Sequence, residues 1–377
     1  MFVLLMGYRR GIREALQRQG VPFVIWSGKE IPWKAGKNSL VVKPYPQSKE
    51  ELISQLGERE VTHIIAGTED SVFPASQARL WLDARRNSHS IILKCTDKLK
   101  MKEYLRDKST PMTPFIGGGK GVDASTIIKE LGLPIVSKPR KSSGGRGVKI
   151  IDNKSDLEKE LGRDKIFEKI IKGSEGSVES VIIDGEVKFS NITEYKRLGH
   201  CNLVPGHYSD TVKEGILDLN KKVIKSLRIK WGMTHLEFYL TDKGILFGEI
   251  ALRPPGGYII DAMEIAYGES FWDLFVKVEL GLDILKFPER IKYSSSYLIH
   301  PGVGIVESIS GEKDVLNIKS LEKIKLSVKA GDEVTQRVGV GQNCGFAFFS
   351  NDDKDKLNTD IDNFEKTLVV KLKPKVK

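Results

Sequence analysis

A glycine-rich stretch between two apolar runs limits the folds open to this chain. The stretch is KPRKSSGGRGV, residues 138–148, with LPIV before it and VKII overlapping its end. This pattern predicts strand, loop, strand. A P-loop would place its lysine after the glycines, at the start of a helix, and a dinucleotide fold needs G-x-G-x-x-G between a strand and a helix. The sequence therefore predicts a flexible hairpin tip, and neither of those nucleotide loops.

The first 95 residues alternate short apolar segments with amphipathic ones, as in an open parallel sheet. FVLLM, PFVIW and THIIAG are expected to be strands, and GIREALQRQG a helix that ends at Gly20. GYRRG, residues 7–11, lacks a complete nucleotide fingerprint and predicts a tight turn. GTEDS, residues 67–71, follows a strand end, where such sheets bind ligands. Glu69 is therefore a candidate for facing a substrate.

From Thr96 onward the pattern changes to long hairpins. TDKLKMKEYLRDKS predicts a helix capped by Thr96 or Asp97. VESVIIDGEVKFSNITE predicts a hairpin about its DG turn, and MTHLEFYLTDKGILFGEIALRP a second hairpin. Helical stretches near 258–280 and a strand-rich, glycine-punctuated end follow. We expect an α/β domain over 1–95, a second domain over 96–290 that includes a small subdomain at about 133–172, and a β-rich subdomain over 291–377.

Composition narrows the class of protein. With 377 residues, 40% of them hydrophobic and 29% charged, the chain can bury a large core. Three scattered cysteines indicate a reducing compartment and show no metal spacing. No stretch approaches the length of a membrane span. The opening MFVLLMG is too short for a signal core, and Arg9 and Arg10 follow it where a signal peptide would have them precede it, so we predict a cytoplasmic protein. The net charge of +10 is spread along the chain without a nucleic-acid motif, and so favours anionic metabolites over nucleic acid.

Two glutamates in the second hairpin carry the sharpest chemical hint. Glu237 and Glu249 each stand among apolar neighbours, where a lone carboxylate is costly. A three-residue turn with Gly244 in the left-handed conformation would place them opposite each other, on one face with His235 and Tyr239. A two- or four-residue turn would pair residue 237 with 248 and send the carboxylates to opposite faces.

A facing pair of carboxylates suits Mg²⁺, which typically completes its shell with water and phosphate oxygens. Arg253 follows closely and could hold a phosphate or a carboxylate with two hydrogen bonds. The alternative is that these are ordinary strand positions with an incidental ion pair. His235 lies on the same strand, but one histidine beside carboxylates does not make a zinc site.

The pieces together resemble the ATP-grasp superfamily over nearly the whole chain. The resemblance lies in the order and spacing of Lys98, Lys138, the glycine-rich tip, FEKIIKGSEGSV at 167–178, and the group Glu237, Glu249 and Arg253. It implies a Rossmann-like N-terminal domain, followed by an ATP-grasp fold with a mobile lid. GEIALRPPGGY and KPRxSxGGRGV are most similar to the carboxylate–amine ligases of that superfamily.

The resemblance also implies roles for particular residues. Lys98 and Lys138 would contact the α- and β-phosphates of ATP, Glu168 the adenine amino group, and Glu175 the ribose. Glu237 and Glu249 would bind one or two Mg²⁺ ions, with Mn²⁺ as a substitute; Ala251 replaces an asparagine that many relatives have there, which leaves the number of ions open. The backbone near Ser143, Gly144 and Gly145 would bind phosphates, the backbone of Lys169, Ile170 and Ile171 would face the adenine edge, and Arg197 would lie on the phosphate side. Arg253 would stabilise the acyl phosphate, with N–H donors from Gly256 and Gly257.

The implied activity is amide or peptide bond formation. A substrate carboxylate attacks the γ-phosphate of ATP to give an acyl phosphate and ADP, and an amine then displaces phosphate. The carboxylate and amine could be amino acids, peptides or carrier-bound acyl groups. Alternatives are a carboxylase or carbamoyl-phosphate-type enzyme that uses bicarbonate, a regulator that binds ATP without turnover, and a basic nucleic-acid-binding protein. A homodimer is the default expectation for a soluble enzyme of this size.

Overall fold

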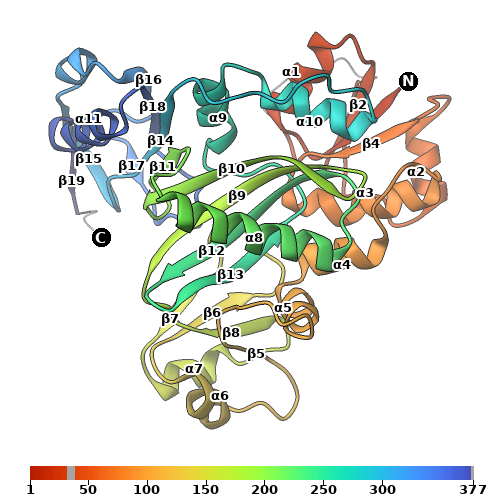
Figure 1. Cartoon of the computed structure of the whole chain (residues 1–377), viewed down its shortest axis with the longest axis horizontal. Coiled ribbons are helices and arrows are strands. Elements are labelled where there is room, and N and C mark those ends of the chain that lie inside the picture. The colour runs from red at the N-terminus through yellow and green to blue at the C-terminus, as the bar shows by residue number, and fades with distance from the viewer. Residues whose placement is uncertain (32–38, 375–377) are drawn as a thin grey trace.

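The computed structural model describes residues 1–31 and 39–374. Its elements form three corners around a long antiparallel sheet (Figure 1). The N-terminal elements make one corner, the small sheet below the centre another, and the C-terminal elements the third. None of the helices in the described ranges has the length and hydrophobicity that crossing a bilayer requires.

A parallel sheet forms the N-terminal corner, as the alternating pattern predicts. Its strand order is β3-β2-β1-β4, with Val3 of β1 opposite Phe23 of β2 and His63 of β4. β1 is buried on both faces, which explains its uninterrupted apolar sequence VLLM. Its elements are β1 (Val3–Met6), α1 (Arg10–Arg18), β2 (Phe23–Ser27), β3 (Leu40–Val42), α2 (Lys49–Leu56), β4 (His63–Ala66), α3 (Glu69–Trp81) and α4 (His89–Thr96).

The long sheet has the order β13-β12-β9-β10-β11-β14-β18-β16. Even-numbered β12 residues such as Leu236 and Phe238 pack with Val223 and its neighbours on α8, while the odd-numbered ones face the other way. Both predicted hairpins are present, and Asp184 and Gly185 take the positive φ of a two-residue turn. The elements of this part are α5 (Lys98–Arg106), β9 (Ser174–Ile183), β10 (Glu186–Arg197), β11 (Cys201–Val204), α8 (Asp210–Leu227), β12 (Gly232–Thr241), β13 (Gly244–Ala251), α9 (Ile259–Tyr267) and α10 (Phe271–Leu280).

A small antiparallel sheet of order β5-β8-β6-β7 carries the glycine-rich tip. β6 and β7 flank residues 140–148, so the predicted strand, loop, strand arrangement is confirmed. The sheet begins at Phe115, earlier in the chain than the boundary near 133 that we expected for the lid. Its elements are β5 (Phe115–Gly117), α6 (Ala124–Leu131), β6 (Ile135–Pro139), β7 (Lys149–Ile151), α7 (Lys154–Glu160) and β8 (Lys165–Lys169).

The C-terminal strands divide between two sheets. β14, β18 and β16 extend the long sheet, and β17, β15 and β19 form a separate one. The long sheet contains strands from both sides of residue 291. The subdomain boundary that we expected at this residue therefore does not coincide with a boundary between two sheets. The elements are β14 (Tyr293–Ile299), β15 (Gly304–Ser310), η2 (Asp314–Asn317), β16 (Leu321–Leu326), β17 (Glu333–Val334), β18 (Gly345–Asn351), α11 (Lys354–Thr367) and β19 (Val369–Lys373).

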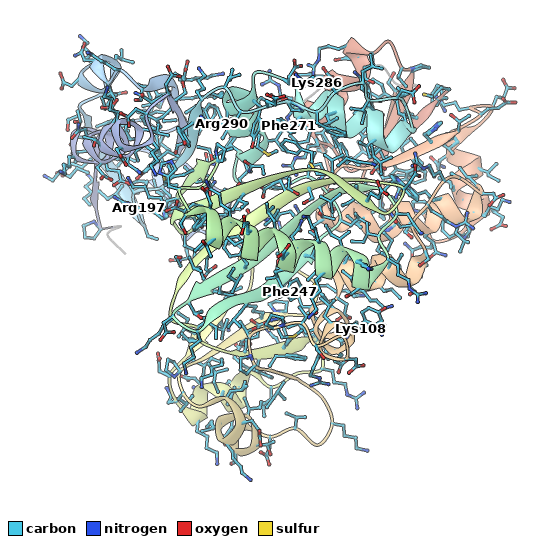
Figure 2. The ribbon with its side chains drawn as sticks, viewed as in Figure 1. Lys108, Arg197, Phe247, Phe271, Lys286 and Arg290 are labelled. Atoms are coloured by element: carbon cyan, nitrogen blue, oxygen red, sulfur yellow. The ribbon has the colours of Figure 1, made fainter. Side chains whose placement is uncertain are left out.

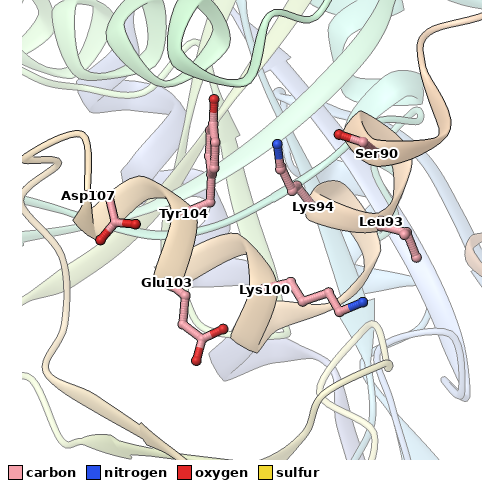
Figure 3. Close-up of a pocket in the computed structure, with 7 residues that line it drawn as sticks. All are labelled: Ser90, Leu93, Lys94, Lys100, Glu103, Tyr104 and Asp107. Atoms are coloured by element: carbon pink, nitrogen blue, oxygen red, sulfur yellow. The ribbon is translucent and has the colours of Figure 1, made fainter.

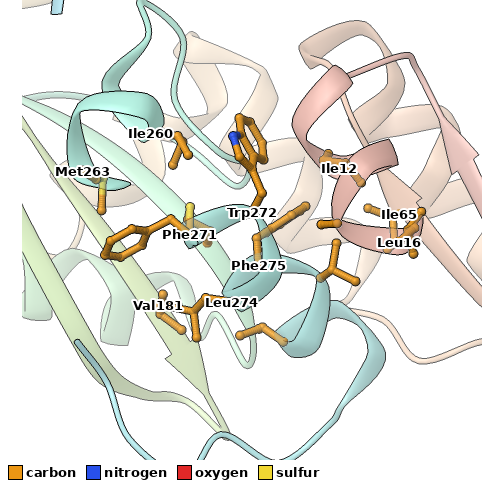
Figure 4. Packing of buried hydrophobic residues seen from close by; sticks show 14 of the residues in the cluster. Ile12, Leu16, Ile65, Val181, Ile260, Met263, Phe271, Trp272, Leu274 and Phe275 are labelled. Carbon is orange, nitrogen blue, oxygen red and sulfur yellow. The ribbon is translucent and has the colours of Figure 1, made fainter. Parts of the chain in front are cut away.

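The main core joins the N-terminal sheet to the long sheet through α10 (Figure 4). Phe271 and Trp272 are buried there, and the guanidinium of Arg9 lies 5.1 Å from the centre of the Trp272 ring. The prediction that GYRRG is a tight turn holds for Gly7, whose φ is +77°, and is wrong for Gly11, which lies in α1. A Cβ atom at Gly11 would be 2.3 Å from Trp272, so only glycine lets α1 approach this ring.

Candidate active site

The two predicted metal-binding carboxylates lie opposite each other on one face of the long sheet. Glu237 of β12 pairs with Glu249 of β13. The turn that joins the strands has two residues, because Thr241 pairs with Gly244, so the three-residue turn that we made the condition for this pairing is wrong. A β-bulge supplies the missing residue: Phe238 pairs with Phe247, which leaves Gly248 as the extra residue before Glu249.

Lys98 brings three segments of the chain to this pair. Its ammonium lies 3.2 Å from the carboxylate of Glu249 and donates a 2.7 Å hydrogen bond to the carbonyl of Ser142 in the glycine-rich loop. The lysine is 7% exposed at the start of α5, where Asp97 caps the helix with hydrogen bonds to two backbone N–H groups. A strand-borne carboxylate, a helix and the glycine-rich loop therefore meet at one positive charge.

Lys138 and Glu168 form a buried charged group on the small sheet. The Lys138 ammonium lies 3.0 Å from Glu168, and the Lys102 ammonium lies 3.1 Å from the other carboxylate oxygen. Burial raises the pKa of Glu168, but the two ammonium groups outweigh it and hold this pKa at about 2. Burial lowers the pKa of Lys138, and Glu168, with Tyr239 and Glu249 from the long sheet, more than reverses this and raises it. The two sheets thus face each other across one set of charges.

Sequence reasoning missed Lys102. It is 1% exposed, burial lowers its pKa, and it pairs with Glu168. The available signal was its spacing from Lys98, since residues four apart lie on the same face of a helix. Two lysines on one face of α5, next to a strand with an isolated glutamate, would have indicated this pair.

The glycines of the loop adopt the backbone conformation that the sequence predicts. Gly144, Gly145 and Gly147 have φ values of +63°, +78° and +72°, which L-residues with side chains rarely adopt. The Ser143 hydroxyl accepts a 2.8 Å hydrogen bond from Arg146 within the loop. The carbonyl of Gly144 accepts a 3.1 Å hydrogen bond from the N–H of Val340, so the tip touches the C-terminal part of the chain.

The segment between β8 and β9 crosses from the small sheet to the long one. Lys169 ends β8 and its N–H donates to the carbonyl of Pro114, and Ile170 and Ile171 follow in the crossing. Glu175 lies at the start of β9, opposite Tyr239 of β12. Burial, and after it the negative charge of Glu237, raises the pKa of Glu175 to about 7. Carboxyl groups with a pKa perturbed by burial and a nearby charge are common at functional sites.

Glu237 has its own partners on the sheet. His235 lies between it and Glu179, 2.9 Å from Glu179 and 3.5 Å from Glu237. Burial lowers the pKa of His235, and the two carboxylates outweigh it and raise it to about 9. Burial likewise raises the pKa of Glu237, and His235 with the nearby lysines brings it to about 2. Glu237 therefore carries negative charge near neutral pH.

These oxygen donors fit a hard divalent cation such as Mg²⁺. Glu249 already has a cationic group, the Lys98 ammonium, at its carboxylate. Within the described residues there is no group of three or more His, Cys, Asp or Glu side chains arranged to hold a metal ion.

A family model describes this part of the chain. Residues 103–266 match the ATP-grasp domain, a span that includes Lys138, Glu168, Glu175 and both metal-ligand candidates. The chain contains an ATP-grasp domain. The resemblance inferred from the sequence is confirmed, and so are the parallel N-terminal sheet and the ATP-grasp fold that it implied.

Relatives of known name extend the likeness beyond the ATP-grasp domain. The chain is 27% identical over 295 residues to the L-arginine-specific L-amino acid ligase of Bacillus subtilis, covering 73% of this chain and 71% of that protein. The L-amino acid ligase from Bacillus licheniformis has the same fold, with a TM-score of 0.80 and 17% identity over 99% of this chain and 98% of that one. Carboxyaminoimidazole ribonucleotide synthase from Aspergillus clavatus, solved with ATP, gives a TM-score of 0.78 and 18% identity over 97% of both chains.

Arg253 and the two glycines after it lie where the ATP-grasp domain meets the N-terminal sheet. The Arg253 guanidinium pairs with Glu69, the candidate from the edge of that sheet. Gly257 has a φ of +61°, and its carbonyl accepts hydrogen bonds from Asn202 (3.0 Å) and Ser296 (2.9 Å). These bonds hold the turn at Gly256 and Gly257 just before α9 begins at Ile259.

Arg197 is placed differently from the other predicted ligands. Its guanidinium forms ion pairs with Asp362, at 3.3 Å, and with Glu365, both on α11. The side chain therefore lies at the end of β10 and points to α11, near the C-terminal elements (Figure 2). Lys196 also turns to α11 and lies 2.9 Å from Asp362. No pattern near Arg197 indicates these partners, because they come from a helix more than 150 residues later in the chain. A phosphate contact by Arg197 stays a prediction.

A separate hollow of about 320 Å³ lies over α4 and α5 (Figure 3). It is lined by Ser90, Leu93, Lys94, Lys100, Glu103, Tyr104 and Asp107. None of these is among the predicted site residues. Lys98 and Lys102 turn another face of α5 toward the glutamates described above.

Proposed function

We propose that this protein is an ATP-dependent carboxylate–amine ligase that forms a carbon–nitrogen bond and releases ADP and phosphate. The observation that carries the proposal is that Glu249 and the glycine-rich loop, both within the ATP-grasp domain, meet at the ammonium of Lys98, which lies just before that domain. Catalysis of this kind rests on positioning and charge neutralisation more than on a protein nucleophile.

ATP is bound between the small sheet and the long sheet. Lys138 and Lys98 supply positive charge to its phosphates, and the glycine-rich loop offers backbone N–H groups to them. Glu175 accepts hydrogen bonds from the ribose, and residues 169–171 face the adenine edge. Glu237 and Glu249 would hold Mg²⁺, which would supply positive charge to the phosphates of ATP. Whether one ion or two are bound stays a prediction.

The reaction has two steps. A carboxylate oxygen of the first substrate forms a bond to the γ-phosphorus, and the bond from that phosphorus to the β–γ bridging oxygen breaks, which gives an acyl phosphate and ADP. The nitrogen of the second substrate then bonds to the acyl carbon, the bond to the phosphate oxygen breaks, and the amine loses a proton. Arg253 stabilises the transferring phosphoryl group, and the turn at Gly256 and Gly257 adds N–H donors.

Amino acids are the substrates that we infer for both positions. Support comes from the likeness to two L-amino acid ligases. It also comes from the ion pair of Arg253 with Glu69, which lies just after the end of β4 in the N-terminal sheet. An arginine there suits a substrate carboxylate, and a glutamate suits an ammonium group. A cytoplasmic location and a homodimer stay predictions from the sequence.

Release of ADP from purified protein tests the proposal. With ATP and Mg²⁺, ADP release should require a pair of amino acids, and mass spectrometry should detect the dipeptide. Glu249→Gln should reduce this rate by about a hundredfold or more, while Glu158→Gln on the exposed face of α7 should leave it unchanged. Stimulation by bicarbonate with a single amine would support a carboxylase instead, and ATP binding without turnover would support a regulator.

A further inference from the structure

A buried polar cluster lies behind Glu237, and the mechanism above makes no use of it. Its centre is Glu179 of β9, which is 1% exposed. One carboxylate oxygen accepts from the Ser177 hydroxyl at 2.7 Å and pairs with Nδ1 of His235 at 2.9 Å. The other accepts from Asn191 at 2.9 Å and from the Thr193 hydroxyl at 2.6 Å. Each carboxylate oxygen of Glu179 thus has two hydrogen-bonding partners, and together these fix the orientation of the carboxylate.

His235 links this cluster to the predicted metal ligand. Nδ1 faces Glu179, and Nε2 lies 3.5 Å from Oε1 of Glu237. The hydroxyl of Tyr195 also donates to Oε1 of Glu237, at 3.3 Å, and lies 3.5 Å from Nε2 of His235. Both contacts reach the same oxygen, so they restrain the rotation of the Glu237 carboxylate and make no use of Oε2.

The three strands that carry these residues are hydrogen-bonded neighbours. His235 pairs with Glu179 across β12 and β9, and Glu237 pairs with Ser177 two residues on. Asn191 extends the cluster to α9, because its Oδ1 accepts a 3.1 Å hydrogen bond from the Tyr267 hydroxyl. The position of the Glu237 carboxylate is therefore set by side chains from β9, β10 and β12, and these are braced against a helix.

Packing alone does not account for this buried polar cluster. A buried charged group often stabilises a fold less than a well-packed apolar residue of similar volume would. The cluster around Glu179 therefore calls for a role other than stability. Replacing a side chain that orients a metal ligand typically lowers metal affinity about 10- to 100-fold. We propose that Glu179 and His235 are positioning residues that hold Glu237 in the orientation for binding the divalent cation. This inference rests on the proposed function, because it takes Glu237 to be a metal ligand.

Two substitutions at one position separate the two contacts of His235. In His235→Asn the amide nitrogen lies near the place of Nδ1, so the contact with Glu179 is kept and the one with Glu237 is lost. In His235→Gln the amide nitrogen lies near the place of Nε2, so the contact with Glu237 is kept and the one with Glu179 is lost. His63→Asn, in the N-terminal sheet, is the matched control.

The measurement is binding of Mn²⁺ in the presence of ADP, followed by the electron paramagnetic resonance signal of free Mn²⁺, together with thermal unfolding. We expect His235→Asn to weaken Mn²⁺ binding about 10- to 100-fold with little change in the unfolding midpoint. His235→Gln should keep more of the Mn²⁺ affinity and unfold at a lower temperature. Binding of ADP without metal, and both readouts for His63→Asn, should match the unsubstituted protein.

The outcomes separate this inference from the proposed function. If the unsubstituted protein binds no Mn²⁺ with ADP, the proposed function fails and this inference fails with it. If it binds Mn²⁺ and His235→Asn binds it equally well, only the positioning role is wrong. Metal affinity that falls in step with the unfolding midpoint in both variants would indicate a purely structural cluster. Should His235→Asn not fold, Tyr195→Phe removes only a hydroxyl and should weaken Mn²⁺ binding several-fold; unchanged binding there would overturn the proposal.

Discussion

Replacing Glu168 with glutamine should destabilise the protein strongly. Its carboxylate lies 3.1 Å from Lys102 and 3.0 Å from Lys138, and the three side chains are 3%, 1% and 15% exposed. Glu168→Gln keeps the shape of the side chain but leaves two ammonium groups buried with no opposing charge between them. Breaking a buried ion pair from one side typically costs about 3–5 kcal/mol. We expect a loss in the free energy of unfolding within that range.

Urea unfolding measures this loss, and hydrogen exchange in β8 reports it locally. Glu158→Gln is the control, because Glu158 on α7 is 56% exposed and 3.9 Å from Lys154, so it should change stability by less than about 0.5 kcal/mol. The double variant Lys102→Met with Glu168→Gln removes one orphaned charge and should be more stable than Glu168→Gln alone. The reasoning is refuted if Glu168→Gln resembles the control, or if the second substitution adds its full separate cost.

The deficit of Glu168→Gln should also depend on pH. Burial already lowers the pKa of Lys102, and without Glu168 this pKa falls further. When a lysine has a lower pKa in the folded state than in the unfolded chain, the unfolded state binds more protons between those two values, so stability rises with pH. The loss in the free energy of unfolding of Glu168→Gln should therefore be largest at pH values below the pKa of Lys102 in the folded state. It should shrink as the pH rises toward about 10.4, the ordinary value of lysine.

The strand register, the loop and the N-terminal contact can be tested in turn. Gly248→Val places a Cβ atom 3.0 Å from the carbonyl of Glu237, so the bulge should be lost and ADP release should fall about a hundredfold, with the far-ultraviolet circular dichroism spectrum unchanged. Gly145→Pro demands a negative φ where the loop has +78°; turnover should fall about tenfold or more, while the unfolding midpoint shifts by only about 2 °C, and unchanged turnover would count against a closing loop. Arg79→Met strands Glu279, its 2.7 Å ion-pair partner, so the loss of stability in urea should reach about 3 kcal/mol, and a loss no larger than that of an exposed substitution would contradict this reading.

The local features of the site were readable from the sequence. The run of glycines between two apolar segments indicates a loop between strands, since only glycine readily takes the positive φ that Gly144 and Gly145 have. The isolated Glu237 and Glu249 predicted a pair of carboxylates on one face of the sheet, and their pairing is confirmed; binding of a cation there stays a prediction. The sequence left Thr96 and Asp97 as the two possible caps of the helix that follows, and the structure shows that Asp97 is the cap. Each of these inferences depends on neighbours within a few residues.

The route by which Glu237 meets Glu249 was not readable in this way. Turn length alone would have sent the two carboxylates to opposite faces, and the bulge at Gly248 corrects the register. A bulge is chosen by the packing of both strand faces together, here α8 on one side and the charged cluster on the other. No pattern within one strand contains that information.

By itself, the sequence determined the alternating N-terminal sheet, the two long hairpins and the glycine-rich loop between two strands. These depend on backbone preferences and on the cost of local burial. Tertiary structure alone decided which charges became partners: Lys102 with Glu168, Arg197 with α11, and Glu179 with His235. A buried charge takes its partner from whichever element the fold packs against it, and distance along the chain does not limit that choice.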